Sequence, residues 1–333
     1  MSKQTKNSSS NNVALPLVIV NPKSAGGSTH ERWREISSDL RAHFGPYNVA
    51  FTLRAGGGIE LAKQGALEGR KFIIACGGDG TINEVANGIL RSGIDCELGI
   101  FPSGTGGDFR RTLGIPSNPR DAAQSLKTGD TKSIDVGKVT FQTFGNETET
   151  RYFLNVSSFG LATSIIERVK TSTSLSWIPS TFLRGKTSFA LSTLQEVLDL
   201  NFTTVRVRVD DGEEKSLNTV NFSIANARFF GGGMKIAPDA KLDDGVFDIV
   251  SFGDIKTAKI LLNAYTLYRG THVRIPEVKS MRAKKIEASP ADPLLEVHLE
   301  VDGELPGKLP AIFEILPNAL RVRVPVNGLN RNK

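Results

Sequence analysis

The sequence predicts an α/β domain with a parallel sheet, followed by an antiparallel β-sandwich domain, and three observations support this prediction. The chain of 333 residues is longer than a single hydrophobic core usually supports, so two domains with a cleft between them are expected. In residues 14–101, short apolar runs alternate with segments of helical periodicity, as in βαβ units. After about residue 138, alternating apolar and polar residues predominate, which is typical of antiparallel strands with one solvated face.

The first half is predicted to alternate strands and helices. Residues 15–20 form an apolar strand candidate, and Trp33, Ile36, Leu40 and Phe44 then recur at helical spacing. The next strands are expected at residues 49–53, 72–76 and 98–101, with helices centred near Ala62 and Val85. Because parallel strands all end at one edge of their sheet, the loops that follow them are expected to converge there.

The second half is predicted to be mostly antiparallel. Strands are expected at residues 203–209, 220–225, 246–252 and 294–301, and amphipathic helices at residues 187–200 and 255–268. The domain boundaries that follow are a disordered tail at 1–12, an α/β domain at 13–137, a β-sandwich domain at 138–310 and a C-terminal strand segment at 311–333. A return of that last segment to the first domain is left open.

Composition excludes several classes of protein. A chain with 39% apolar and 23% charged residues is neither disordered nor collagenous. Two cysteines, Cys76 and Cys96, are too few for a disulfide framework and lie in apolar surroundings, which predicts buried thiols in a reducing compartment. The longest uncharged apolar stretch falls short of the roughly 20 residues that a spanning helix needs. The net charge of +6 favours anionic partners only weakly.

The most informative segment is residues 71–90, where an apolar strand runs into Gly-Gly-Asp-Gly-Thr and then into a helix. Gly77, Gly78 and Gly80 allow the backbone to approach phosphate oxygens, and the helix start beyond Thr81 offers free N–H groups. Asp79 would repel a phosphate unless a divalent cation stood between them, so the loop suggests bound Mg²⁺.

Two further glycine loops follow strand candidates, at residues 21–27 and 102–109. Three converging loops predict one ligand site, in which Asn21, Thr81 and Thr105 donate to phosphates or ribose. Asp108 and Asp135 would join Asp79 in a carboxylate network around metal-bound water. A Walker A loop is excluded, because Ser180 stands where its first glycine is needed before Gly185-Lys186-Thr187, and protein-kinase motifs are absent.

The motifs together resemble a known family. NPKSAGG, CGGDGTINEVANGI, PSGTGGDF, APDAKLDDGVFD and VDGE, in this order, look like the diacylglycerol kinase catalytic family, in its bacterial soluble branch. That branch is related to sphingosine and ceramide kinases and more distantly to NAD kinases. The resemblance implies an NAD kinase-like nucleotide-binding α/β domain, a C-terminal β-sandwich that takes the lipid, and an active site in the cleft between them.

The resemblance also implies roles for individual residues. The residues expected to contact ATP, together with Asn21, are Thr52, Gly77, Gly78, Asp79, Gly80, Thr81, Ile82, Asn83 and Thr105. Asp79, Asp108 and Asp135 would surround the catalytic Mg²⁺ through water. A structural Mg²⁺ would take the carboxylate of Asp244 and the backbone carbonyls of Lys241 and Val246, which are the hard oxygen ligands that Mg²⁺ prefers. Glu304 is the favoured proton acceptor, with Asp302 as the alternative.

One departure from the family pattern stands in the third loop. Gly107 occupies the position where asparagine is expected, and Arg110 the position where alanine is common. The missing amide removes a hydrogen bond to the nucleotide or to the loop, which bears on nucleotide affinity and not on the fold.

The sequence therefore predicts an ATP-dependent lipid kinase that converts diacylglycerol to phosphatidic acid with Mg²⁺ as cofactor. Three alternatives stay open: a sphingoid, ceramide or other lipid acceptor, a soluble acceptor such as NAD, and a non-catalytic nucleotide or lipid sensor. We expect a cytoplasmic protein that contacts the inner face of the membrane transiently and binds no nucleic acid. A homodimer is left open.

Overall fold

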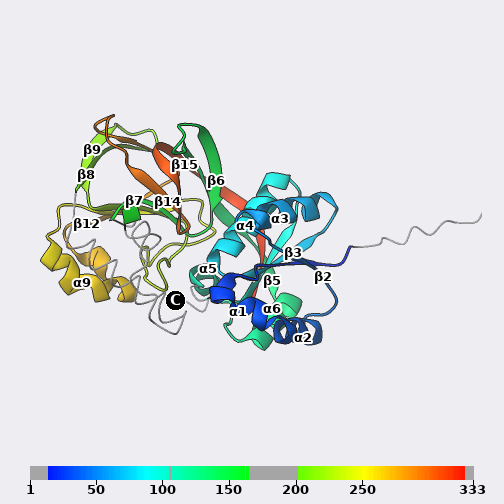
Figure 1. Cartoon of the computed structure of the whole chain (residues 1–333). Helices are drawn as coiled ribbons and strands as arrows, with labels where there is room; N and C mark the ends of the chain where they lie inside the picture. Colours follow the sequence, from blue (N-terminus) through cyan, green and yellow to red (C-terminus); the bar gives the residue numbers. More distant parts are fainter. Residues whose placement is uncertain (1–13, 105–106, 162, 165–201, 327–333) are drawn as a thin grey trace, which may run out of the picture.

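A computed structural model describes residues 14–104, 107–161, 163–164 and 202–326 (Figure 1). The α/β part, blue to cyan, lies beside a β-rich part, green to orange. This arrangement confirms the predicted fold class. Three expectations lie outside the described residues, namely the tail at 1–12, the helix at 187–200 and the contact of Thr105 with ATP.

Four parallel strands form the centre of the α/β domain, in the order β2-β1-β3-β4. They are β1 (Leu17–Val20), β2 (Asn48–Phe51), β3 (Phe72–Gly77) and β4 (Glu97–Pro102). Alternate residues of β1 enter two different cores, because helices cover both faces of the sheet: Leu17 and Ile19 pack on one side, Val18 and Val20 on the other. The strands predicted from apolar runs are therefore confirmed.

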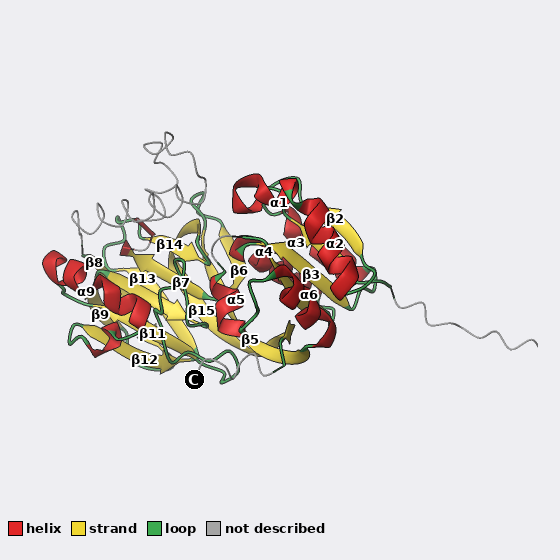
Figure 2. Ribbon diagram, turned by 90° about the horizontal axis from the view of Figure 1, so that it is seen from below, coloured by secondary structure: helices red, strands yellow, loops and turns green. Residues whose placement is uncertain are grey.

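The helices of this domain pack their apolar sides onto the sheet (Figure 2). α3 (Gly57–Leu67) and α4 (Asp79–Ser92) cover one face, while α2 (Trp33–His43) and α6 (Pro119–Thr128) cover the other. The shorter helices are η1 (Ser24–Gly27), α1 (Ser28–Glu31) and α5 (Asp108–Leu113). Local sequence explains the start of α6, where the Asn118 side chain accepts two backbone N–H groups and Pro119 follows as the first helical residue.

The second domain is a sandwich of two antiparallel layers. One layer contains β7 (Val156–Gly160), β10 (Asn221–Ala225), β11 (Phe247–Phe252), β12 (Val278–Ala283) and β14 (His298–Val301). The other contains β6 (Thr148–Phe153), β8 (Thr203–Val209), β9 (Lys215–Thr219) and β13 (Lys285–Pro290). Buried phenylalanines fill the space between the layers, with Phe153 stacked on Phe247 and Phe159 on Phe222.

Two long strands, β5 (Asp130–Gln142) and β15 (Glu304–Val324), run antiparallel to each other through both domains. Ile134 of β5 belongs to the core of the α/β domain and Phe141 to the core of the sandwich. The far end of β15 also pairs in parallel with β4, through Arg321 and Glu97. The strands of the described residues consequently join into one 15-stranded sheet. Figure 2 shows β5 and β15 between the two domains.

Two details of the second half differ between prediction and structure. The predicted strand at 294–301 begins only at His298, because Asp292 accepts the backbone N–H groups of Leu294 and Leu295 and so forms a turn that leaves Leu294 90% exposed. The predicted helix at 255–268 is α9 (Thr257–Arg269), followed by η2 (His272–Arg274). Among the described residues, the helices are all too short or too polar to cross a membrane.

Candidate active site

The loops that follow β1 to β4 surround a cavity of about 500 Å³, to which the second domain contributes Glu304. The residues that line it are Asn21, Lys23, Ser24, Ala25, Thr52, Leu53, Arg54, Ala55, Gly78, Asp79, Gly80, Thr81, Glu84, Gly104 and Glu304. The predicted convergence of the glycine loops at one sheet edge is thus present in the structure.

Hydrogen bonds between side chains tie the loops to one another. Asn21 donates from Nδ2 to Oγ1 of Thr81 over 3.1 Å, which links the first loop to the start of α4. The hydroxyl oxygens of Ser24 and Ser103 lie 3.3 Å apart, and Thr29 donates to the carbonyl of Ser103. These hydrogen bonds connect the loop after β1 to the start of α4 and to the loop after β4.

The second and third glycine loops approach each other so closely that side chains are excluded. A Cβ atom on Gly104 would lie 2.4 Å from the Cα atom of Gly78. Gly78 is also the N-cap of α4, whose 14 residues point their positive end and first N–H groups toward the cavity. This wall of the cavity can therefore accept an anion.

Asp79 has partners that the sequence did not indicate. Its carboxylate accepts the backbone N–H groups of Gly107, Asp108 and Phe109, over 2.7 to 3.2 Å, at the start of α5. The negative charge thus joins the second loop to the third. A metal ion could contact Asp79 only through the lone pairs that these three N–H groups leave open.

Asp108 and Asp135 lie outside the cavity lining. Asp108 accepts from the Arg111 guanidinium over 2.7 Å and from the Gly232 backbone over 2.8 Å, and burial raises the pKa of this carboxyl. Asp135 is fully buried and accepts the backbone N–H groups of Gly245 and Asn318. Among the described residues, these carboxylates form no cluster that could bind a metal ion directly.

The segment that contains Lys241, Asp244 and Val246 has an atom that suits a cation. Oδ1 of Asp244 is buried and has no hydrogen-bond partner among the described residues, while its other oxygen lies 3.8 Å from Arg282. A buried carboxylate oxygen without a donor is costly unless a cation or water satisfies it. A carboxylate oxygen is a ligand that a hard cation such as Mg²⁺ prefers, so this atom fits the predicted site.

Asp302 and Glu304 stand in very different surroundings although one residue separates them. The carboxylate of Asp302 accepts Nδ2 of Asn83 and the backbone N–H groups of Leu154, Asn155 and Val156, all within 3.1 Å. Burial raises the pKa of Asp302 to about 6, and these donors act against the rise. Asn83 lies on α4 and the three backbone donors lie in the sandwich, so Asp302 links α4 to the sandwich.

Glu304, by contrast, lines the cavity and has a side chain that is 56% exposed. Its carboxylate lies 3.2 Å from the guanidinium of Arg151, which also contacts Glu149 over 2.8 Å. Arg151 was not identified from the sequence, because its position on an exposed strand gave no motif. Of the two acids in the turn, Glu304 is the one with free access to a ligand.

Glu84 is a further residue that the sequence did not single out. Its two carboxylate oxygens accept the backbone N–H groups of Gly56 and Gly58, each over 2.8 Å, and so hold the start of α3 beside the cavity. Lys23 and Arg54 also line this wall, and the Arg54 guanidinium pairs with Glu60 over 2.6 Å. The contacts of Glu84 come from residues about 30 positions apart, which no local pattern reveals.

The structure does not bring every predicted residue to the cavity. Gly77 ends β3 beneath it, where a Cβ atom would clash with Thr81, and Ile82 is buried in the core. Asn83 donates to Asp302 and to the carbonyl of Tyr152, and so faces the sandwich. The cavity thus takes Asn21, Thr52, Gly78, Asp79, Gly80, Thr81 and Glu304 from the predicted set.

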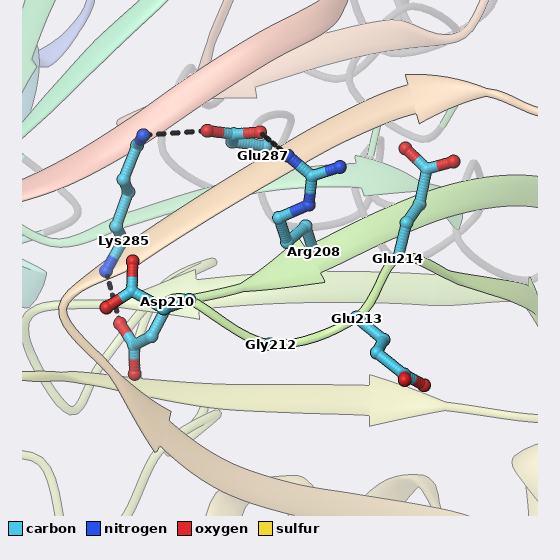
Figure 3. A pocket seen from close by; sticks show the side chains of 8 residues that line it. Arg208, Asp210, Gly212, Glu213, Glu214, Lys285 and Glu287 are labelled. Carbon is cyan, nitrogen blue, oxygen red and sulfur yellow. Dashed lines mark hydrogen bonds and ion pairs between the residues drawn. The ribbon is translucent and has the colours of Figure 1, made fainter.

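A second hollow lies on the sandwich at the turn between β8 and β9 (Figure 3). It is polar, with Glu287 between Arg208 and Lys285 and with the acidic turn at residues 210–214 beside them. Arg282 likewise pairs with Asp248. Arg208, Lys285 and Arg282 therefore all have acidic partners.

Comparison with known proteins gives matches along most of the chain. Residues 16–139 match the family described as the diacylglycerol kinase catalytic domain, and residues 169–324 match the YegS C-terminal NAD kinase beta sandwich-like domain. A diacylglycerol kinase of Bacillus subtilis (strain 168) is 30% identical over 275 residues, which are 82% of this chain and 84% of that protein. A diacylglycerol kinase of Staphylococcus epidermidis is 32% identical over 259 residues, 78% of this chain and 76% of that protein.

Solved structures agree with the sequence matches. A crystal structure from Bacillus anthracis str. Sterne has a TM-score of 0.73 at 25% identity and covers 96% of this chain and 98% of that chain. A second, of a diacylglycerol kinase from the same strain, has a TM-score of 0.68 at 24% identity, with 93% and 96% covered.

Proposed function

This chain belongs to the diacylglycerol kinase family of lipid kinases, and we propose that it transfers the γ-phosphoryl group of ATP to the hydroxyl group of diacylglycerol. The matches confirm the resemblance drawn from the sequence motifs. One observation supports the proposal most strongly: a solvent-accessible carboxylate of the second domain, Glu304, lines the same cavity as the glycine loops and the N-terminus of α4.

The nucleotide end of the cavity is suited to a triphosphate. Free N–H groups at the start of α4 and the cations Lys23 and Arg54 would bind phosphate oxygens, while Asn21 and Thr81 offer polar side-chain atoms beside them. Mg²⁺ that accompanies ATP would neutralise phosphate charge, and Asp79 lies at the start of α4, where lone pairs that its three N–H donors leave open could face the ion. Asp79 also holds the loops in place through the amides at the start of α5.

The acceptor end of the cavity supplies a base. The lipid hydroxyl oxygen would form a bond to the γ-phosphorus as the bond to the bridging oxygen breaks and ADP leaves, and the hydroxyl proton would pass to the carboxylate of Glu304. Arg151 orients that carboxylate in the absence of substrate. Asp302 is less suited to this role, because four N–H donors already occupy it.

The acceptor lipid has to reach the cavity from a bilayer. We therefore propose that the protein meets the inner face of the membrane transiently, as a cytoplasmic enzyme. The surface near Arg282 and Lys285 is a weak candidate for this contact, because both side chains pair with acids.

A lipid phosphorylation assay tests the proposal. Protein, Mg²⁺ and labelled ATP are incubated with mixed micelles of diacylglycerol, sphingosine or ceramide, and separately with NAD. We expect labelled phosphatidic acid as the main product. Label in NAD alone, or in no acceptor while ATP still binds, would contradict the proposal.

Substitution of the base gives a sharper test. Glu304→Gln should lower kcat by at least about 100-fold, the usual contribution of a general base, with the affinity for ATP unchanged. Glu314→Gln is the matched control, because Glu314 lies on the same strand and pairs with Lys138 away from the cavity. Equal turnover of the two variants would move the base elsewhere.

A further inference from the structure

Glu300 is a buried acid that has no role in the proposed reaction. Glu300 lies on β14, four residues before Glu304, and is only 4% exposed. One of its carboxylate oxygens accepts the backbone N–H group of Gly303 over 2.6 Å, and the other lies 2.6 Å from the hydroxyl of Ser158 on β7. A carboxyl group this deeply buried needs a physical explanation, because burial disfavours its charged form.

The contact with Gly303 holds the turn that carries Glu304. Asp302 and Gly303 both have positive φ, 46° and 87°, and connect Val301 to its strand partner Glu304 as a two-residue hairpin. Gly303 lies between Asp302, whose carboxylate holds the turn, and Glu304, which lines the cavity. The direction in which Glu304 leaves the turn therefore depends on the Glu300 contact.

The surroundings of Glu300 favour a neutral carboxylic acid. β7 has no ionisable side chain, and the charged group that acts on Glu300 among the described residues is the Asp302 carboxylate, which is also negative. On β15, Glu304 pairs with Arg151 and Lys308 pairs with Glu296. Burial raises the pKa of Glu300 to about 8, with a smaller contribution from the Asp302 charge, while the hydrogen bonds from Ser158 and Gly303 act against the rise.

A neutral acid satisfies every atom of this group. Oε1 accepts the Gly303 N–H, and Oε2 lies 2.6 Å from the Ser158 hydroxyl, which donates to an ionised oxygen and can rotate to accept the proton of a neutral acid. If Glu300 were ionised, its charge would lie close to the negative charge of Asp302, and no cation among the described residues acts on Glu300 to offset the repulsion.

We propose that Glu300 is a positioning residue that acts as a neutral carboxylic acid, holding the Gly303 amide so that Glu304 points into the cavity. This inference rests on the proposed function, since it concerns the proposed base. The same contact makes turnover sensitive to alkaline pH, because loss of the Glu300 proton puts a second charge beside Asp302.

The kinetic test compares Glu300→Gln, which has the shape of the neutral acid, with Glu300→Ala, which lacks the acceptor. At pH 7 the Gln variant should keep kcat within about threefold of wild type, and the Ala variant should lose on the order of 100-fold, the scale of a misplaced catalytic group. The KM for ATP should stay unchanged in both. Glu287→Ala, in the distant hollow of Figure 3, is the matched control.

The pH profile separates positioning from a merely structural role. Between pH 7 and pH 9 the ratio of kcat for the Gln variant to kcat for wild type should rise about tenfold, because wild type becomes mostly ionised above its pKa. A constant ratio would overturn the proposal, as would a Gln variant that is as slow as the Ala variant at pH 7. The comparison needs only wild type and the Gln variant, so it stands even if Glu300→Ala does not fold.

A folding measurement keeps this inference distinct from the proposed function. The pKa of Glu300 is raised in the folded state, so its contribution to stability falls as pH rises from the unfolded pKa toward about 8. The urea midpoint of wild type should thus fall relative to that of the Gln variant over this range. If this shift occurs but the protein phosphorylates no lipid, only the proposed function is wrong. If the urea midpoints of wild type and the Gln variant change equally with pH, the proposal that Glu300 is a neutral acid is wrong.

Discussion

At the scale of single residues, the environment separates acids that look equivalent in the sequence. Asp302 and Glu304 belong to one VDGE motif, yet the first accepts four N–H groups and the second is open to the cavity. Glu300, two positions earlier, is buried between Gly303 and Ser158. One turn thus presents three carboxyl groups whose roles follow from burial and donors.

Gly107 and Arg110, the two departures from the family pattern, are in contact. Gly107 adopts the left-handed conformation, with φ of 73°, and a Cβ atom there would lie 3.1 Å from Nε of Arg110. Arg110 in turn donates to the carbonyl of Ile115 over 2.6 Å. The absence of a side chain at 107 therefore leaves room for the guanidinium of Arg110.

This contact predicts coupling between the two positions. Gly107→Asn should lower the free energy of unfolding by about 1 kcal/mol, because asparagine tolerates left-handed φ but meets Arg110. Combined with Arg110→Ala, the loss should be smaller than the sum of the single losses by about 0.5–1 kcal/mol. Urea unfolding of the four proteins measures this.

The matched control for that cycle is Gly93→Asn. Gly93 has φ of 67° and no atom within 4 Å of its ideal Cβ position, so it reports the backbone cost without the neighbour. Strictly additive effects of the changes at 107 and 110 would show that the two departures are independent.

At the scale of elements, hydrogen bonds from distant side chains fix the loops. Glu84 of α4 holds the start of α3, and Asp79 holds the start of α5. Asp135 of β5 does the same for the loop at residues 241–246: its carboxylate accepts the Gly245 N–H, and its own N–H donates to the carbonyl of Leu242. That loop presents the unpaired Oδ1 of Asp244.

The loop at residues 241–246 predicts a stabilising Mg²⁺ site. Millimolar Mg²⁺ should raise the free energy of unfolding of wild type by about 1–3 kcal/mol, because an ion that binds only the folded state stabilises it by mass action. Asp244→Asn should abolish this gain, whereas Asp243→Asn, at the exposed neighbour, should keep it. Urea unfolding with Mg²⁺ or with EDTA measures the effect, and equal gains in the two variants would place the ion elsewhere.

At the scale of the whole molecule, β5 and β15 make the two domains one sheet. β15 begins at Glu304 beside the cavity and ends in the α/β domain, where Arg323 contacts both carboxylate oxygens of Glu97 over 2.6 and 2.7 Å. Glu97 is only 8% exposed and also accepts from Thr131. This ion pair connects the C-terminal end of β15 to the start of β4.

Removal of that ion pair should destabilise the whole chain. Arg323→Ala should cost about 3–5 kcal/mol of unfolding free energy, since it leaves the buried Glu97 carboxylate without its cation. Arg321→Ala is the control two residues earlier, where the partner Asp95 is 73% exposed and the loss should stay below about 1 kcal/mol. Similar losses in the two variants, measured by urea unfolding, would contradict the importance of this pair.

The sequence alone determined the parallel sheet, the three converging glycine loops and the family, because periodicity, turn residues and motif order are local properties. It also identified seven of the residues that line the cavity. It left the choice between Asp302 and Glu304 open and passed over Glu84, Arg151 and Glu300. The water-mediated network of Asp79, Asp108 and Asp135 stays a prediction. Only the tertiary structure decided the partners of these side chains, since they come from positions as far apart as 219 residues, and burial and hydrogen bonding exist only once those segments meet.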